Sequence, residues 1–409
     1  MATDLPLVEL LLDTRDRTLD LVRDLTDDQL IVPHLEIVNP FTWELGHVAW
    51  FYEQWCLRKL RGLPPLREDG DALWNSMAVH HDTRWDLPMP SRAGTLAYMQ
   101  SILDQCRDAL LDRQLSEEEV YLHLYSVQHE DMHAEAFTWT RQTLAYPAPS
   151  MGVEPWERVE AGGLAGDVEV PEGTYRIGQE QDCGEWCFDN EKWAHDVELS
   201  AFQIARAPVT NAEYAEFVEA DGYTRSEFWD EEGWKCLRMI ESECPRYWRR
   251  VDGAWQRRHF DQWTLLPPHE PIVHVSWFEA SAYCRWAKRR LPSEAEWEVA
   301  ATGSKRGNLG WRALGPIDVG CLPETDSDCG CRQMLGNVWE WTADAFGPFP
   351  GFTPDMYKDY SAPWFGDHRV ARGGCWATQP RMARRHYRNY AKPWRRDLFY
   401  GFRTCALSS

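Results

Sequence analysis

Two histidines stand four positions apart in the segment QHEDMHAEAF, residues 128–137. In an α-helix, residues four apart lie on the same face with Cβ atoms about 6 Å apart, so His129 and His133 could both bind one metal ion. Glu135 comes two positions after His133 and is rotated about 200° away around the helix axis. We therefore expect an outer-shell or packing role for Glu135.

Two imidazoles hold a metal ion poorly, so a third ligand has to come from another helix. His47, within TWELGHVAWF, is the leading candidate because aromatic and apolar residues surround it in the sequence. His80, His81 and His123 are alternatives. A pair of histidines in a helix can also be part of a core or a surface without binding metal, and the spacing alone leaves both possibilities open.

The residues before position 150 predict four long helices, because apolar residues recur there at helical spacing. These helices are expected at about residues 8–22, 42–60, 93–111 and 116–144. Ser116 and Glu119 have the spacing of a capping box, which marks the start of the last helix. The set predicts an antiparallel bundle with His47 on its second helix and the histidine pair on its fourth.

The chain changes character near residue 150, where YPAPSMGVEP (146–155) reads as a linker. Beyond it, a strand is expected at about 168–179 and short helices at about 211–220, 277–290 and 293–301. We therefore expect an α+β protein with two domains, residues 1–150 and residues 151–409.

Composition restricts the partners. The 409 residues have a formal net charge of -22, which argues against nucleic acid or an anionic membrane as partner and favours a small molecule. No apolar run approaches the roughly 20 residues that cross a bilayer, and the start MATDLPLVELL does not resemble a signal peptide, so a cytoplasmic protein is expected. The twelve cysteines are expected to be reduced, and the spacings of Cys183/Cys187 and Cys329/Cys331 fit zinc patterns poorly.

Read together, several motifs resemble the ergothioneine-type sulfoxide synthases over nearly the whole chain. The motifs are, in order, NPFTWELGHVAWFYE, QHEDMHAE, PVTNAEYAEFV, PIVHVSWFEASAYCRWAKRRLPSEAEWEVAA, MLGNVWEWTAD, RVARGGCWAT and HYRNYAKPWRRDLFYGFR. The resemblance implies a DinB-like four-helix bundle followed by a formylglycine-generating-enzyme-like domain with a C-type-lectin-like core. It also implies that His47, His129 and His133 hold a non-haem iron(II) ion.

The family couples a thiol to the imidazole carbon of Nα-trimethylhistidine (hercynine) with dioxygen as oxidant, and a related branch, selenoneine synthase, uses a selenosugar. Three neutral imidazoles on an octahedral iron leave three positions for the donor atom, the acceptor and dioxygen. The resemblance aligns Tyr357 with a proton-donating tyrosine and Tyr360 with a residue that lines the hercynine site. Asn389 and Tyr390 match positions that contact hercynine, whose quaternary ammonium suits an aromatic face.

The resemblance indicates the identity of the sulfur or selenium donor less clearly than it indicates the fold and the metal ligands. Relatives that use γ-glutamylcysteine have an acidic residue where this chain has Ala391, and two arginines where NSMAVHHDTRWDLP has only Arg84, with Asp86 nearby. Met132 replaces a glutamine of some relatives and makes the pocket less polar. The pattern favours a selenosugar or thiosugar donor, with cysteine second and γ-glutamylcysteine as the ergothioneine-type alternative.

Two other classes of function are possible from the sequence. A formylglycine-generating oxidase uses cysteines after its RGG segment, but Cys375 in RGGCWATQPRMARR has no second cysteine at the expected distance. A lectin-like domain that only binds a ligand would leave the histidines of the bundle without a role. Bound iron would distinguish these classes from an iron enzyme.

Overall fold

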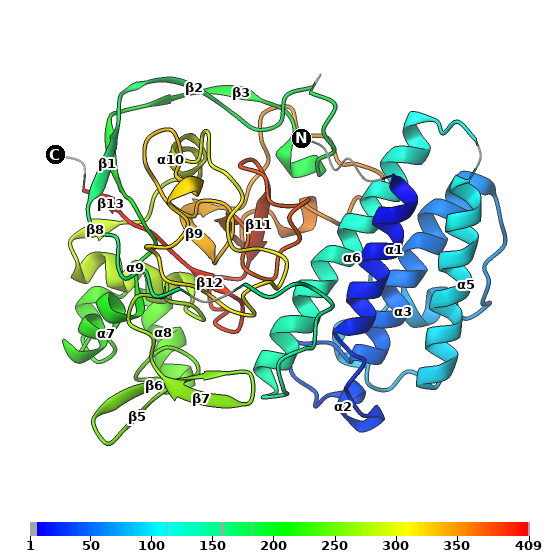
Figure 1. The fold of residues 1–409 in the computed structure, drawn as a ribbon, viewed down its shortest axis with the longest axis horizontal. Coiled ribbons are helices and arrows are strands. Elements are labelled where there is room, and N and C mark those ends of the chain that lie inside the picture. The colour runs from blue at the N-terminus through cyan, green and yellow to red at the C-terminus, as the bar shows by residue number, and fades with distance from the viewer. Residues whose placement is uncertain (1–5, 112, 157–158, 182, 408–409) are drawn as a thin grey trace. The chain divides into compact units, whose positions relative to one another are not determined.

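The computed structural model describes residues 6–111, 113–156, 159–181 and 183–407. The chain divides into two compact units, Met1–Gly152 and Val153–Ser409. Helices form the first unit, while the second combines short helices with β-sheets (Figure 1). The expected α+β composition, with helices first and sheets afterwards, is therefore confirmed.

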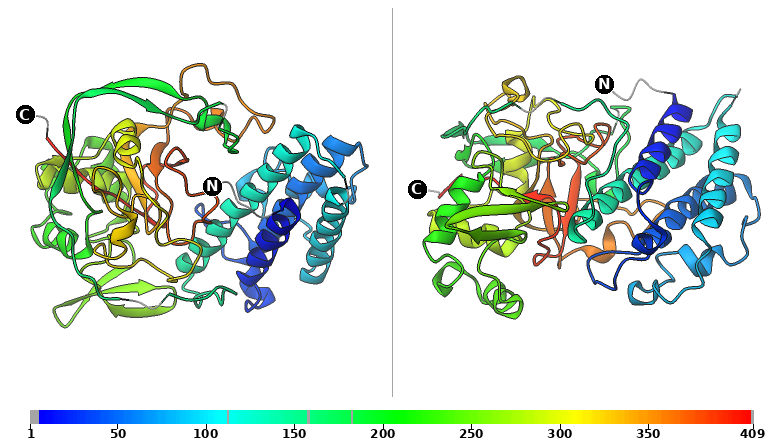
Figure 2. Two further views of the ribbon diagram at one scale, coloured as in Figure 1. Left: turned by 45° about the horizontal axis from the view of Figure 1, so that its top comes forward. Right: turned by 60° about the horizontal axis from the view of Figure 1, so that its bottom comes forward.

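The first unit is a helical bundle. Its main helices are α1 (Leu7–Asp20), α3 (Phe41–Tyr52), α5 (Arg92–Leu110) and α6 (Glu117–Thr143), and two short helices are α2 (Asp27–Ile31) and α4 (Gly70–Trp74). Helices α1 and α3 each pack against both α5 and α6, and the four lie side by side in Figures 1 and 2. The bundle places α3, which carries His47, directly against α6, which carries the histidine pair.

Helix α6 is fixed at its start and along its back. The capping box at Ser116 and Glu119 is present, so the side chain of each bonds to the backbone N–H of the other. On the back of α6, buried Arg15 of α1 donates to Glu130 at 2.8 Å, and Thr14 donates to Asp131 at 2.6 Å. These contacts fix the rotation of α6 about its axis and so the direction of its histidines.

The second predicted helix is present, but it changes type within its length. After Tyr52 the α-helix α3 continues as the π-helix η1 (Glu53–Lys59). A π-helix closes i→i+5 hydrogen bonds, and such turns occur often near functional sites. The structure also has five short 3-10 helices among its described residues: η2 (His81–Thr83), η3 (Asp189–Glu191), η4 (Ser226–Phe228), η5 (Pro323–Thr325) and η6 (Ala362–Trp364).

The second unit is built on small sheets. Within its described residues the sheet orders are β1-β4-β13-β8, β11-β10-β9-β12, β2-β3 and β5-β6-β7. The strands are β1 (Asp167–Val170), β2 (Gly173–Ile177), β3 (His195–Leu199), β4 (Phe202–Ala205), β5 (Trp248–Val251), β6 (Ala254–His259), β7 (Gln262–Leu265), β8 (Arg289–Arg290), β9 (Trp339–Ala345), β10 (Arg369–Arg372), β11 (Arg388–Ala391), β12 (Tyr400–Gly401) and β13 (Cys405–Ala406). Strand β11, with Asn389 and Tyr390, pairs antiparallel with β10.

The helices of the second unit are α7 (Asn211–Glu219), α8 (Glu231–Ile240), α9 (Trp277–Trp286) and α10 (Glu294–Ala300). The predicted helices at 211–220, 277–290 and 293–301 correspond to α7, α9 and α10, although α9 ends early and β8 follows it. The single strand expected at 168–179 is wrong, because the structure has β1 and β2 there in different sheets. Pro171 lies between them and has no N–H to donate to a continuous ladder.

Buried ion pairs run through the second unit. Arg372, which is 0% exposed, contacts Glu294 at 2.7 Å and Glu298 at 2.6 Å. Arg388 also contacts Glu294 at 2.7 Å, while Arg403 and Glu340 form a separate buried pair. Trp297 packs between these groups, with its indole N–H donating to Glu340. Short strands are thus connected by charged side chains as well as by backbone ladders.

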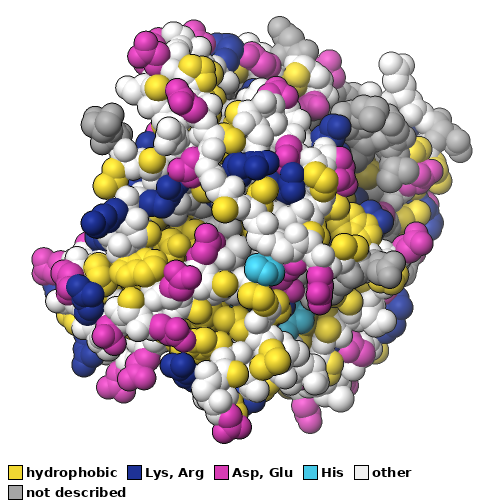
Figure 3. All heavy atoms as spheres, turned by 60° about the vertical axis from the view of Figure 1, so that its left-hand side comes forward, with side chains coloured by type: hydrophobic (Ala, Val, Ile, Leu, Met, Phe, Trp, Pro, Cys, Tyr) yellow, Lys and Arg dark blue, Asp and Glu magenta, His cyan; other side chains and the backbone are white. Residues whose placement is uncertain are grey.

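The surface of the protein carries both charged and hydrophobic side chains. On the face shown in Figure 3, acidic and basic side chains are interspersed with hydrophobic ones. Among the described residues, no helix combines the length and apolar character that crossing a membrane requires.

Candidate metal centre

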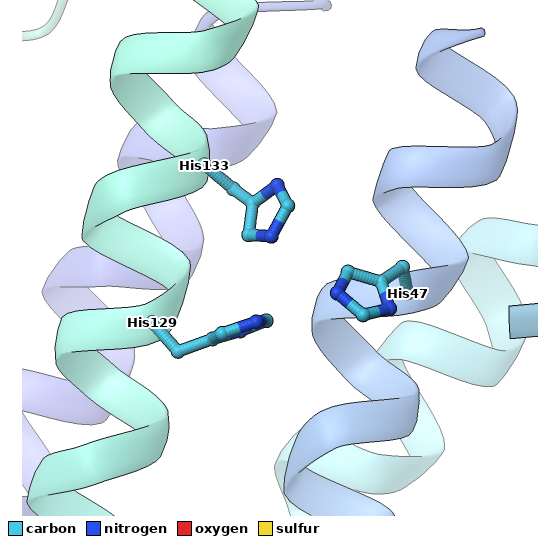
Figure 4. Close-up of side chains that lie close together, drawn as sticks. All are labelled: His47, His129 and His133. Carbon is cyan, nitrogen blue, oxygen red and sulfur yellow. The ribbon is translucent and has the colours of Figure 1, made fainter. Parts of the chain in front are cut away.

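Three histidines meet between α3 and α6. His47 comes from α3 and His129 and His133 come from α6, and all three rings point into the space between the helices (Figure 4). One potential ligand atom from each lies within 4.8 Å of the others. His47 and His129 are buried, while the side chain of His133 is 19% exposed. The geometry therefore brings together the histidines that the sequence placed on different helices.

Contacts on the far side of each ring fix its orientation. The Nδ1 atom of His47 lies 2.7 Å from the carbonyl oxygen of Trp74. A carbonyl can only accept, so Nδ1 carries the hydrogen and Nε2 keeps its lone pair. The indole of Trp43 is stacked on the same imidazole, with ring centroids 4.7 Å apart and planes 11° from parallel.

His133 and His129 are oriented in different ways. Nδ1 of His133 lies 2.9 Å from Oε1 of Glu44, one turn before His47 on α3, in the carboxylate–histidine arrangement common behind metal-binding imidazoles. The ring of His129 is stacked on Phe51, with centroids 3.8 Å apart and planes 9° from parallel. The same helix, α3, thus supplies one of the three histidines and orients the other two.

The electrostatics keep the imidazoles neutral, which is the form that binds metal ions. Burial lowers the pKa of His47 and His129 well below the usual value, and their neighbouring histidines add to the effect. Burial, with a contribution from Arg84, lowers the pKa of His133 to about 4. Burial also raises the pKa of Glu44 to about 8, so its ionised form needs a nearby positive charge, such as a metal ion on His133.

A glycine makes this packing possible. A Cβ atom at Gly46 would lie 2.1 Å from the Cε2 and Nε1 atoms of the Trp74 indole, which is less than any real contact. The absence of a side chain at Gly46 therefore allows α4 to approach α3 closely enough for the Trp74 carbonyl to reach His47.

The alternative ligands lie elsewhere. His123 is buried on α6, where Nδ1 bonds to the carbonyl of Glu119, and the described cluster does not include it. His81 bonds through Nε2 to the carbonyl of Val38, and neither His81 nor His80 belongs to the cluster. Glu135 is buried on α6 outside the cluster.

Arg84 and Met132, expected to contact the donor, both lie in the first unit. The guanidinium of Arg84 stacks on Trp43 at 3.7 Å and donates to Oδ1 of Asn39 at 2.6 Å, while Met132 is half-buried on α6 beside His133. Arg84 also borders a groove of about 440 Å³ in this unit. Its other lining residues are Asp27, Leu30, Ile31, Pro40, Thr42, Trp85, Leu87, Pro88, Met89, Pro90, Ser91 and Arg92.

The other predicted site residues belong to the second unit. The hydroxyl of Tyr390 donates to the backbone carbonyl of Tyr360, and the two rings meet edge to face at 6.1 Å. Tyr390 also stacks on Phe346 at 3.9 Å, which makes an aromatic cluster. Tyr357 is half-buried and close enough to Tyr390 to influence its pKa. Asn389 bonds through Oδ1 to the N–H of Tyr390.

Several supporting residues were missed by reasoning from the sequence. Glu44 had a detectable signal, because a residue three positions before His47 shares its helix face. Phe51 had the same kind of signal, four positions after His47. No sequence signal indicated the Trp74 carbonyl. It is a backbone atom on a short separate helix, so the spacing of side chains carries no information about it.

Comparison with known proteins identifies both units. The family model described as the sulfatase-modifying factor enzyme 1-like domain matches residues 156–313 and 310–407, and the DinB superfamily model matches residues 10–140. The predicted fold, a DinB-like bundle followed by a formylglycine-generating-enzyme-like domain, is therefore confirmed.

Two curated relatives match almost the whole chain, and a third matches about half of it. It is 37% identical over 413 residues to the hercynine oxygenase of Mycobacterium tuberculosis, covering 95% of this chain and 96% of that protein. It is 36% identical over 421 residues to the hercynine oxygenase of Mycolicibacterium thermoresistibile, covering 96% and 93%. The formylglycine-generating enzyme of Streptomyces coelicolor is 31% identical over 270 residues, covering 56% of this chain and 85% of that enzyme.

Proposed function

Because this chain belongs to the hercynine oxygenase family, we propose that it is an iron(II)-dependent oxidoreductase that uses dioxygen to join a selenium or sulfur donor to the imidazole carbon of hercynine. The observation that carries the proposal is the cluster of His47, His129 and His133 between α3 and α6. A relative that only binds ligands would not need three inward-facing neutral imidazoles with oriented rings.

The donor set fits iron(II). Imidazole nitrogen suits iron, and three protein ligands leave positions for reactants. When bound, iron(II) supplies redox chemistry with dioxygen and a common point of attachment for the reactants. Thiolate ligands, which would favour zinc or copper(I), do not belong to the described cluster.

The chain's own residues prepare this centre before any substrate arrives. The Trp74 carbonyl holds the hydrogen of His47 on Nδ1, so that Nε2 faces the cluster. Ionised Glu44 acts in the same way on His133, because a carboxylate can only accept from Nδ1. Stacking on Phe51 keeps the His129 ring from rotating. Preorganised ligands of this kind bind metal more tightly than mobile ones, because less freedom is lost on binding.

In the second unit, we assign hercynine contacts to Tyr360, Asn389 and Tyr390 and the proton donor to Tyr357. The edge-to-face rings of Tyr360 and Tyr390 give an aromatic surface of the kind that attracts a quaternary ammonium group. The phenol of Tyr357 carries an O–H donor and can give a proton to an oxygen of the reacting group.

The metal assignment is tested by measuring iron. The purified chain should bind about one iron(II) ion, and His47→Ala should lose most of the iron and nearly all turnover of hercynine. His80→Ala is the matched control, because His80 lies outside the described cluster. Full iron content and turnover in His47→Ala would refute the assignment.

For the donor, we propose a selenosugar or thiosugar in preference to γ-glutamylcysteine. Ala391 is buried on β11 and brings no acidic group for a donor amine, and Arg84 already stacks on Trp43 and bonds to Asn39. Each missing charge-assisted bond removes roughly 1.5 to 3 kcal/mol, so two together lower the efficiency by about two to four orders of magnitude. A sugar selenolate needs no such charge partners.

One observation favours the alternative donor and keeps it as the second candidate. Arg92 borders the same groove as Arg84, so a second guanidinium is present that the motif comparison does not reveal. Arg92 is occupied in part, since it donates to the carbonyl of Leu25 at 2.6 Å and to that of Val22 at 3.1 Å. A dicarboxylate donor would have to compete with these bonds.

A competition experiment separates the donors. Hercynine, iron(II) and dioxygen are supplied with a 1-selenosugar, a 1-thiosugar, cysteine and γ-glutamylcysteine at equal concentrations, and the products are separated by mass. The sugar donors should be coupled fastest. Dominance of γ-glutamylcysteine would reject the sugar proposal, and its loss in Arg92→Gln would then identify the groove as the donor site.

A further inference from the structure

Two cysteines separated by one glycine face each other in the loop before β9. The Sγ atoms of Cys329 and Cys331 lie 3.8 Å apart. Ser327 holds the turn with its side chain and its backbone: the N–H of Cys331 donates to Oγ of Ser327 at 3.0 Å, and the N–H of Ser327 donates to the carbonyl of Cys331 at 2.8 Å. Gly330 has a φ of +97°, which L side chains rarely adopt, so glycine is needed between the cysteines.

The two thiols have different environments. Cys331 is 0% exposed and belongs to the hydrophobic core of the second unit, whereas Cys329 is only partly buried at the edge of that core. The Cys329 sulfur also lies 3.3 Å from Oγ of Ser327 and 3.3 Å from the carbonyl oxygen of Ala300. The pair therefore combines a partly buried cysteine with a fully buried one.

The two thiols also differ in pKa. The neighbouring Cys331 thiol, together with Ser327, lowers the pKa of Cys329 to about 6, while the same contact and burial raise the pKa of Cys331. Cys329 is therefore the more acidic thiol of the pair, and the thiolate is the reactive form of cysteine.

We propose that Cys329 and Cys331 form a redox-active dithiol that reacts with small hydroperoxides and closes to a disulfide. The Cys329 thiolate attacks the outer oxygen of the peroxide, which forms a sulfenic acid, and the released alkoxide or hydroxide takes up a proton. Cys331 then attacks the Cys329 sulfur, which forms the disulfide and releases water. Overall, two thiols lose two electrons and two protons, and the hydroperoxide is reduced to an alcohol, or to water from hydrogen peroxide, with one further water.

The geometry favours a dithiol over a metal site of ordinary kind. A metal ion held by protein side chains needs a third or fourth ligand, and among the described residues no additional histidine, cysteine or carboxylate joins this pair in a cluster. Closing the disulfide requires the sulfurs to approach from 3.8 Å to about 2.05 Å, a movement that rotation of two side chains on a glycine-containing turn can supply. The inference does not depend on the proposed function of the histidine cluster.

The experiment uses the reduced full-length chain and hydrogen peroxide as the probe. After treatment, free thiols are alkylated and the digested peptides are analysed by mass spectrometry. The peptide that contains both cysteines should lose two hydrogens and regain them with dithiothreitol. Without peroxide, Cys329 should be alkylated on the order of tenfold faster at pH 7 than Cys236, a partly buried thiol whose pKa is raised by burial.

Variants separate the two roles. Cys331→Ser should stop the reaction at a sulfenic acid on Cys329 that dimedone traps, whereas in Cys329→Ser the buried Cys331 should stay unmodified. The same oxidation in the His47→Ala chain excludes radicals generated by iron at the histidine cluster. If peroxide oxidises exposed Cys183 but leaves the Cys329–Cys331 peptide unchanged in the wild-type chain, the proposal is wrong, and this result needs no variant to fold.

Discussion

The bundle and the second unit position their candidate site residues by different physical means. In the bundle, histidines project from two long helices, and helix geometry determines which side chains share a face. In the second unit, the residues lie on short strands and loops joined by buried ion pairs. Among described residues, two non-glycine residues of the bundle have positive φ values, compared with twelve in the second unit.

This difference shows where each unit is vulnerable. A residue in a regular helix keeps its direction as long as the helix forms, so the bundle depends on packing close to the histidines. A loop residue keeps its direction only while its tertiary partners remain, and left-handed backbone persists only where the surroundings enforce it. Substitutions should therefore lower stability most in the second unit and metal affinity most in the bundle.

The largest effect is expected from Arg372→Met. This change leaves Glu294 and Glu298 buried without their shared partner, which should reduce the free energy of unfolding by about 3–5 kcal/mol. Urea unfolding followed by circular dichroism measures it. Arg285→Met is the control: its pair with Asp230 is 43% and 34% exposed, and its loss should change stability by less than about 1 kcal/mol. Equal effects of the two changes would contradict the comparison.

An intermediate effect is expected from Gly46→Ala in the bundle. The new Cβ atom would lie 2.1 Å from the Trp74 indole, so α4 or the indole must move, at roughly 1–3 kcal/mol of stability. The movement should also weaken iron binding, because the Trp74 carbonyl orients His47. Gly70→Ala on α4 is the control, with no described neighbour closer than 3.8 Å to its added carbon. Thermal unfolding and iron content together give the result.

The smallest change in stability is expected from Glu44→Gln, which affects the metal instead. An amide can accept from Nδ1 of His133 but carries no negative charge, so iron(II) affinity should fall by about 10- to 100-fold. The urea midpoint should stay close to that of the parent chain. Glu9→Gln, at an exposed position of α1, should change neither quantity. Unchanged affinity in Glu44→Gln, measured by chelator competition, would show that the hydrogen bond does not support the metal.

The bundle could be predicted from the sequence in some detail. The spacing of His129 and His133, the apolar surroundings of His47 and the capping box at Ser116 each act within one helix, where position in sequence gives position in space. The structure gathers the same three histidines. The role of Trp74 escaped prediction because it depends on α4 reaching α3 through an absent side chain at Gly46.

The second unit was less accessible to such reasoning. Three of its helices, α7, α9 and α10, could be recognised from apolar residues at helical spacing, whereas α8 was not expected. The strand pairings could not, because short strands such as β8 and β12 exist only through partners far away in the sequence. The buried partners of Arg372 and Arg403 were equally hidden, since charged residues in a sequence normally indicate a surface.

The π-helical turn after Tyr52 has a consequence for how the bundle tolerates a change in chain length. Each i→i+5 bond spans one residue more than an α-helical bond, so the turn holds an extra residue within one continuous helix. Deleting a single residue between positions 53 and 59 would let α-helical bonding replace it and would leave the residues that follow close to their present direction. The same deletion upstream, between Glu44 and His47, would rotate the two residues relative to each other by about 100°. The segment that can lose a residue thus lies directly after the one that cannot.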